Sequence, residues 1–203
     1  MGKDNLFAED ITSLPEDTTG IDKVAKKRVN GNRKGKNFER SICDDLGKRF
    51  GGVFRRVPTS GAMVGGMNRF KYADINEAAK LTLAGDIICP PHYNFVTECK
   101  NYYDSPKISN ILSIGDRDLD SWIDQAKIES EFVKKDWMII FKITVLRGKT
   151  FIAVDYDKFT SLHQTLPITY IKYKSCIILD YDIFFDTLVA PYIEDYKKTR
   201  MST

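Results

Sequence analysis

The sequence predicts an α/β protein with a central mixed β-sheet flanked by helices. Two patterns alternate along its 203 residues. In some segments apolar residues recur every three to four positions, as in an amphipathic helix. In others, short runs of β-branched and aromatic residues lie between turn-forming residues, as in strands. The resulting order is helix, strand, hairpin, helix and further strands, which is typical of a sheet with helices packed on its faces.

The chain is expected to begin with an arm over residues 1–33, followed by a single domain over residues 34–203. The arm is polar and acidic to about residue 22 and then becomes basic. Residues 23–36 contain seven Lys or Arg and no acid. Charge alone leaves two interpretations of this run open, a solvated linker or a segment that contacts phosphates.

A helix is predicted over residues 37–50, and the pair Gly51-Gly52 ends it. Its apolar stripe consists of Phe38, Ile42 and Leu46. Glu39 lies beside that stripe, at the border of the face expected to be buried. A short strand is predicted next, over residues 53–57.

The middle of the chain is predicted to hold a loop, a helix and two strands. Residues 61–66 are glycine-rich and small, which favours a loop, and residues 75–84 have a helical pattern. Strands are expected over 86–89 and 95–100. Because a short turn with two prolines at residues 90–94 joins them, the two strands are predicted to form an antiparallel hairpin.

The last hundred residues are predicted to be irregular at 101–119 and helical at 120–135. Two strands, 137–146 and 150–156, are separated by the basic turn Arg147-Gly148-Lys149, which indicates a second hairpin. Residues 168–190 add one or two strands, or a strand and a short helix.

Three residues of the middle segment carry chemistry: Asp86, Glu98 and Lys100. Side chains at positions i and i+2 of a strand point to the same face, so Glu98 and Lys100 share one. Asp86 opens the neighbouring strand and is expected to approach Glu98. Two close carboxylates repel unless a cation lies between them, and such oxygen ligands suit Mg²⁺ or Mn²⁺. The simpler interpretation is a cross-strand salt bridge with a solvated lysine.

Composition excludes several classes of protein. The four cysteines form no C-x-x-C pair, so a structural zinc site is not indicated and buried free thiols are expected. There is no signal peptide, no membrane span and no phosphate-binding P-loop, so we expect no membrane association and no nucleotide cofactor. A cytoplasmic or nucleoid-associated protein is expected, and a secreted one is not.

Four segments, in this order, resemble a known family. They are Lys34-Gly35-Lys36-Asn37-Phe38-Glu39-Arg40, Arg56-Val57-Pro58-Thr59-Ser60-Gly61, Gly85-Asp86-Ile87-Ile88 and Glu98-Cys99-Lys100. Together they resemble the PD-(D/E)XK nuclease superfamily, whose fold is restriction-endonuclease-like, and most closely its archaeal-type Holliday junction resolvases. The chain differs in having Gly85 where the superfamily commonly has proline. It also differs in an insertion at about 62–84 and in a β-rich C-terminal extension.

The resemblance implies a role for each matching residue. Lys100, Glu98, Asp86, Glu39 and Ser60 would be catalytic, with Ser60 near the scissile phosphate. A metal site for Mg²⁺, with Mn²⁺ accepted, would involve Asp86, Glu98, Glu39 and Cys99. DNA-binding residues would be Lys34, Lys36, Arg40, Arg55, Arg56 and Gln125. Arg55 and Arg56 could instead pair with core carboxylates, and Gln125 could be a surface polar residue.

The function expected from this resemblance is metal-dependent, structure-specific DNA cleavage. The substrate would be a four-way (Holliday) junction, and a homodimer would match its two-fold symmetry. Two alternatives remain open: a restriction- or repair-type nuclease acting on linear duplex or ends, and a catalytically silent DNA-binding protein.

Overall fold

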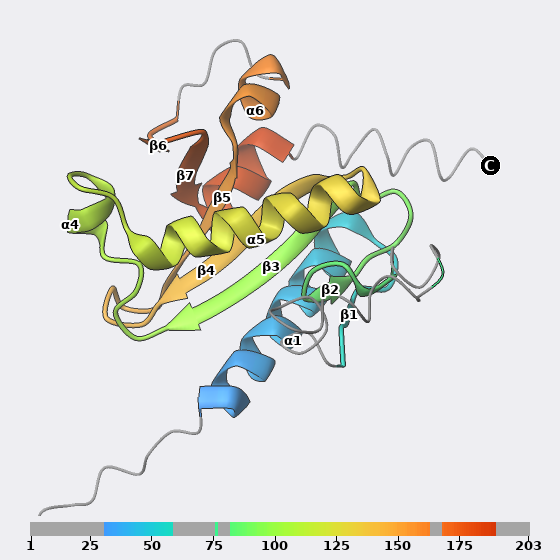
Figure 1. The fold of residues 1–203 in the computed structure, drawn as a ribbon. Coiled ribbons are helices and arrows are strands. Elements are labelled where there is room, and N and C mark those ends of the chain that lie inside the picture. The colour runs from blue at the N-terminus through green and yellow to red at the C-terminus, as the bar shows by residue number, and fades with distance from the viewer. Residues whose placement is uncertain (1–30, 59–75, 77–81, 163–167, 190–203) are drawn as a thin grey trace, which may run out of the picture.

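A five-stranded mixed sheet forms the centre of the molecule (Figure 1). The computed structural model describes residues 31–58, 76, 82–162 and 168–189. The strands are β1 (Arg55–Arg56), β2 (Ile87–Ile88), β3 (Phe95–Tyr102), β4 (Asp136–Ile143), β5 (Lys149–Asp155), β6 (Ile171–Tyr173) and β7 (Cys176–Asp180). The order in the large sheet is β3-β4-β5-β7-β6, and β1 and β2 form a separate pair. Within the large sheet, β3 and β4 are parallel and the other pairs are antiparallel, which confirms the predicted fold class.

Helices cover both faces of this sheet. They are α1 (Gly31–Phe50), α4 (Ile108–Ile111), α5 (Arg117–Val133), α6 (Tyr156–Leu162) and α7 (Tyr181–Ile183), which continues into a π-helical segment, Phe184–Val189. Figure 1 shows α5 crossing in front of β3 and β4. The other face of these strands packs against the apolar stripe of α1. Strand β4 is buried along nearly its whole length because it lies between the two helical layers.

Helix α5 begins at residue 117, three residues earlier than predicted, because Asp116 caps it. The Asp116 Oδ1 atom accepts hydrogen bonds from the backbone N–H groups of Asp118 and Leu119, both at 3.1 Å. The helix then returns the chain so that β4 lies parallel to β3, which is the usual role of a crossover helix. Its buried face includes Trp122, Ile123, Ala126 and Val133.

The predicted hairpin of β2 and β3 is wrong in its pairing. Strand β2 pairs with β1, through Arg55 opposite Ile88 and Arg56 opposite Ile87. Its link to β3 is the hydrogen bond from Asp86 N–H to Thr97 O, at 2.8 Å. The physical reason is that β2 turns away from β3 immediately after Asp86 and satisfies its backbone groups on the other side. The hairpin predicted for β4 and β5 is confirmed.

Other local predictions also needed correction. The segment predicted as irregular holds the end of β3 and the short helix α4, and the helix predicted from residue 37 already begins at Gly31. The predicted alternative of a strand and a short helix within residues 168–190 matches β7 and the helical residues 181–189, whereas α6 was not predicted. The predicted loop at 61–66 and most of the predicted helix at 75–84 lie outside the described residues, although Thr82 and Leu83 are helical.

The region after residue 135 supplies four of the five strands of the large sheet. Strand β3, which carries Glu98 and Lys100, lies at the edge of this sheet and pairs with β4. The C-terminal strands are therefore part of the sheet that supports those two residues. Within the described parts of the chain, no helix is both long and apolar enough to cross a bilayer.

Candidate active site

Strand β3 places Glu98 and Lys100 on the face covered by α5. The Lys100 Nζ atom donates to Glu98 Oε2 at 2.7 Å, and the Glu98 side chain is only 2% exposed. Cys99, between them, points to the opposite face and packs in the core beneath α1. The shared face predicted from strand alternation is thus present, and the lysine is paired inside the protein rather than solvated.

Asp86 reaches this strand from the end of the turn before β2. Its Oδ2 atom accepts the backbone N–H of Cys99 at 2.8 Å, and its own N–H donates to Thr97 O. Two backbone-directed contacts therefore fix Asp86 beside Glu98. The residue is buried, with 7% of its surface exposed.

Gly85 makes this approach possible. Its φ is +74°, in the left-handed region, and an added Cβ would lie 2.7 Å from Thr97 O. Proline fixes φ near −65° and cannot adopt this conformation. The backbone conformation of this turn therefore requires the glycine at residue 85, where the superfamily that the sequence resembles commonly has proline.

Glu39 lies near the centre but is engaged elsewhere. Its carboxylate forms a close ion pair with the Arg56 guanidinium, and the two side chains are 12% and 16% exposed. This pair joins α1 to β1. Of the two interpretations of Arg56, the structure has it paired with a core carboxylate. In the parts of the chain that the structure describes, no group of three or more His, Cys, Asp or Glu side chains is arranged to hold a metal ion.

The carboxylates of this centre are electrostatically crowded. Burial, and next the charge of Asp86, raise the pKa of Glu98 well above its ordinary value. The same two causes raise the pKa of Glu39, while Arg56 opposes them. Burial of Lys100 disfavours its charged form, but the charges of Glu98 and Asp86 outweigh this and raise the pKa of Lys100. Lys100 is therefore held as an ammonium ion.

Two residues of α5 extend this cluster. Gln125 Oε1 accepts from Lys100 Nζ at 3.3 Å, and Gln125 Nε2 donates to Glu129 Oε1 at 3.1 Å. The other oxygen of Glu129 accepts the N–H of Gly85 at 2.7 Å. Gln125 is therefore not simply a surface polar residue.

Glu129 was not predicted as a site residue, although the sequence contains a signal for it. The buried stripe of α5 runs through Trp122, Ala126 and Val133, and Glu129 falls on the same helical face. An acidic residue on a buried stripe needs a partner, and Gln125 is one helical turn away.

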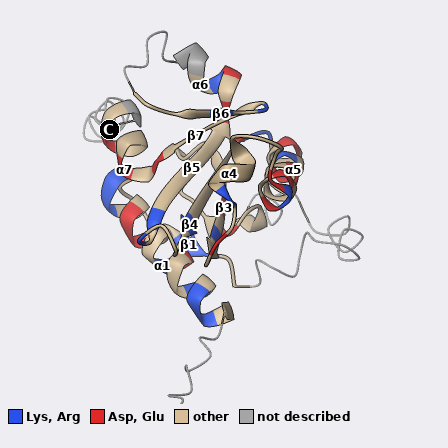
Figure 2. Cartoon of the chain, turned by 90° about the vertical axis from the view of Figure 1, so that its left-hand side faces the viewer, with Lys and Arg blue, Asp and Glu red and all other residues tan. Residues whose placement is uncertain are grey.

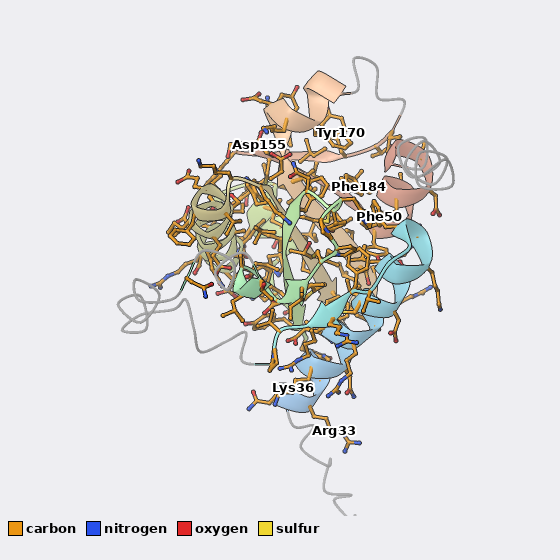
Figure 3. The ribbon with its side chains drawn as sticks, turned by 90° about the vertical axis from the view of Figure 1, so that its right-hand side faces the viewer. Arg33, Lys36, Phe50, Asp155, Tyr170 and Phe184 are labelled. Atoms are coloured by element: carbon orange, nitrogen blue, oxygen red, sulfur yellow. The ribbon has the colours of Figure 1, made fainter. Side chains whose placement is uncertain are left out.

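Three of the six predicted DNA-binding residues, Lys34, Lys36 and Arg40, lie on α1, and the others lie on β1 and α5. The side chains of Lys36 and Arg40 are exposed, while Lys34 donates to Thr144 Oγ1 at 2.6 Å and so ties α1 to the turn after β4. Figure 2 shows basic residues at the N-terminal end of α1, and Figure 3 places Arg33 and Lys36 at that same outer end. Arg55, on β1, is exposed as well. Ser60 lies outside the described residues.

The four cysteines are unpaired thiols, as expected. Burial raises the pKa of Cys99 well above its ordinary value, so its thiol stays protonated. A protonated thiol is a poor ligand for a hard cation. Any contribution of residue 99 to a metal site would come from its backbone carbonyl oxygen.

The donor set fits a hard divalent cation. Asp86 and Glu98 provide two buried carboxylates whose mutual repulsion a cation would relieve. Backbone hydrogen bonds hold Asp86, and β3 carries Glu98. The arrangement combines a pair of acids, one ammonium ion and a nearby basic helix, which are the groups that hydrolysis of a phosphodiester requires.

Comparisons with known proteins agree with this chemistry. Residues 30–201 match the family model described as a phage putative PDDEXK endonuclease. The chain is also similar to Protein D14 of Escherichia phage T5. The two are 32% identical over 131 residues, which are 63% of this chain and 72% of that protein. No solved structure gives a significant match.

Proposed function

Because the chain belongs to the phage putative PDDEXK endonuclease family, we propose that it is a Mg²⁺-dependent DNA endonuclease with a reaction centre formed by Asp86, Glu98 and Lys100. One observation carries this proposal. Asp86 is held by the N–H of the residue between Glu98 and Lys100, and its charge acts on both of these groups. Packing of β3 does not require two buried carboxylates beside a lysine, and the desolvation of these carboxylates is unfavourable.

The ammonium group of Lys100 has a defined task in this proposal. Because the pKa of Lys100 is raised, its side chain is a hydrogen-bond donor and a fixed positive charge rather than a base. It can orient the attacking water and stabilise the charge that develops on the phosphate. The contact to Gln125 limits its rotation, which preserves this orientation.

Asp86 and Glu98 would hold the metal ion, with the carbonyl oxygen of Cys99 as a further ligand. When bound, Mg²⁺ or Mn²⁺ would neutralise charge on the scissile phosphate and activate water for attack. Glu39 supports the site from the second layer, because its ion pair with Arg56 fixes α1 against β1. Glu98 would bind the cation as a carboxylate, the form that its ion pair with Lys100 favours.

DNA would approach along the N-terminal end of α1. The first turn of α1 has no acidic residue and carries Arg33 and Lys34, with Lys36 following. Positive charge at a helix N-terminus is unfavourable for the helix itself, since the helix dipole is also positive there. Phosphate groups would remove this conflict. The proposed contacts are Lys34, Lys36, Arg40, Arg55, Arg56 and Gln125, with Ser60 near the scissile bond.

The preferred substrate in our proposal is a branched DNA, most specifically a four-way junction cut by a homodimer. The support for this finer statement is the order of the basic α1 segment, the Arg56–Gly61 segment and the Glu98–Lys100 strand in the sequence. A two-fold dimer would present two reaction centres to a two-fold junction.

A cleavage assay tests both levels of the proposal. Labelled four-way junctions and linear duplexes of the same sequence are incubated with purified protein in Mg²⁺, in Mn²⁺ and in chelator. We expect cleavage with either metal, none in chelator, and a faster reaction on the junction. Asp86→Asn removes a proposed ligand and should abolish cleavage, while sedimentation of the protein reports whether it is a dimer.

The possible outcomes separate the alternatives. Equal cleavage of linear DNA would favour a restriction- or repair-type nuclease. DNA binding without cleavage, and without metal binding by calorimetry, would favour a silent DNA-binding protein. Undiminished cleavage by Asp86→Asn would refute the assignment of the centre.

A further inference from the structure

Glu129 is a buried acid with no role in the reaction centre as described so far. It lies on α5 and is 4% exposed. Its carboxylate accepts the backbone N–H of Gly85, the residue directly before Asp86. No lysine or arginine forms a salt bridge with it among the described residues. Its carboxylate is satisfied by one backbone amide and one side-chain amide.

The hydrogen bonds around Glu129 have a fixed direction. Lys100 can only donate, so the atom of Gln125 that faces it must be the carbonyl oxygen. The Gln125 amide nitrogen then faces Glu129 and donates to Oε1. The Gly85 N–H donates to Oε2. Glu129 must accept at both oxygens, and an ionised carboxylate is the side-chain group that does so.

We propose that Glu129 is a positioning residue of this centre. With one oxygen it holds the Gly85 turn that presents Asp86. With the other it fixes which end of the Gln125 amide faces Lys100. This inference rests on the proposed function, because the groups that Glu129 positions are those proposed to cut DNA. It adds a residue 31 positions beyond Glu98 that links both arms of the site through hydrogen bonds.

The direction of the hydrogen bonds predicts an unusual set of variants. In Glu129→Gln, the side chain keeps its shape, but an NH₂ group that can only donate replaces one of its two accepting oxygens. This NH₂ group must face either Gly85 N–H or Gln125 Nε2. Either arrangement puts two donors together. In Gln125→Glu, two carboxylates meet and repel. Both single variants should therefore lose positioning.

Exchanging residues 125 and 129 restores a donor and an acceptor to each of the three hydrogen bonds. In the double variant Gln125→Glu with Glu129→Gln, residue 125 accepts from Lys100 and from the amide nitrogen of residue 129. The carbonyl oxygen of residue 129 then accepts the Gly85 N–H. The number of charges is unchanged, and each donor again faces an acceptor.

The experiment measures single-turnover cleavage, DNA affinity, Mn²⁺ affinity by calorimetry and unfolding in urea for the wild type and these three variants. Glu131→Gln is the matched control, because it makes the same chemical change on the same helix at an exposed position. We expect each single variant to lose about 10–100-fold in cleavage rate or metal affinity, as is usual for residues that orient metal ligands. DNA affinity should be unchanged in Glu129→Gln, and the exchange should recover most of the loss in cleavage rate and metal affinity.

Two results would overturn the inference. One is a cleavage rate and metal affinity for Glu129→Gln equal to those of Glu131→Gln, with any loss confined to unfolding, which would make Glu129 merely structural. The other is an exchange variant whose cleavage rate and Mn²⁺ affinity do not exceed those of the less active single variant. If the wild type cleaves no DNA, the proposed function fails, and the same comparison in Mn²⁺ affinity and unfolding decides the inference by itself.

Discussion

Replacement of Gly85 by alanine tests how tightly the turn before β2 must approach β3. Two effects are expected to add. The residue has φ of +74°, which costs an L-amino acid about 1–2 kcal/mol. The new Cβ would also lie 2.7 Å from Thr97 O, which is 0.7 Å closer than the 3.4 Å at which ordinary contacts begin. Because that neighbour is backbone, the turn must move, and overpacking of this kind costs about 1–3 kcal/mol.

Gly51→Ala is the matched control for this variant. Gly51 has a similar φ of +69°, but nothing lies within 4 Å of an added Cβ. Gly51→Ala should therefore be destabilised only by the cost of the left-handed backbone conformation. Urea unfolding should therefore show Gly85→Ala to be less stable than Gly51→Ala by about 1–3 kcal/mol.

The same displacement should affect catalysis. Asp86 follows Gly85 directly, and a misplacement approaching 1 Å can reduce a rate by about 100-fold. We expect this loss in single-turnover cleavage by Gly85→Ala under conditions where it is fully folded, and none in Gly51→Ala. If the two variants unfold at the same urea concentration and cleave equally, the close approach does not constrain the site.

Three further outcomes are expected. Lys100→Met should lower the cleavage rate about 100–1,000-fold while leaving Mn²⁺ affinity undiminished, since the lysine is a donor and not a ligand; weaker metal binding would contradict this. Protons compete with the cation for Glu98, and burial and the charge of Asp86 raise the pKa of Glu98, so Mn²⁺ affinity should rise as the pH increases above the ordinary carboxyl range. Calorimetry in two buffers of different ionisation enthalpy checks this, and a pH-independent affinity would count against it. Asp116→Ala removes the cap of α5 and should destabilise the protein by about 1–2 kcal/mol in urea, whereas the exposed Asp118→Ala should cost less.

Removal of one negative charge from this site should raise the free energy of unfolding of the metal-free protein. The charge of Asp86 raises the pKa values of both Glu98 and Glu39, so all three acids are less stable together than apart. A group whose pKa is raised on folding contributes less stability as the pH rises through that window. Such a conflict in the resting state is common where a site is built to receive a cation.

Several features of this protein were readable without a structure. Strand alternation places Glu98 and Lys100 on one face, and the four-residue spacing of Phe38, Ile42 and Leu46 marks the buried face of α1. The mixed sheet flanked by helices also followed from the pattern. These inferences succeed because they depend on the local repeat of a strand or helix, which the order of residues determines directly.

Other features depend on which distant segments meet, and only the tertiary structure decided them. The turn of β2 toward β1, the need for glycine at residue 85 and the ion pair of Glu39 with Arg56 all follow from packing between separate elements. The contact between Gly85 and Glu129 joins residues 44 positions apart. The sequence determined that Asp86, Glu98 and Lys100 were candidates for one site. The crossover of α5 over β3 decided how they are held, because it alone brings Gln125 and Glu129 to them.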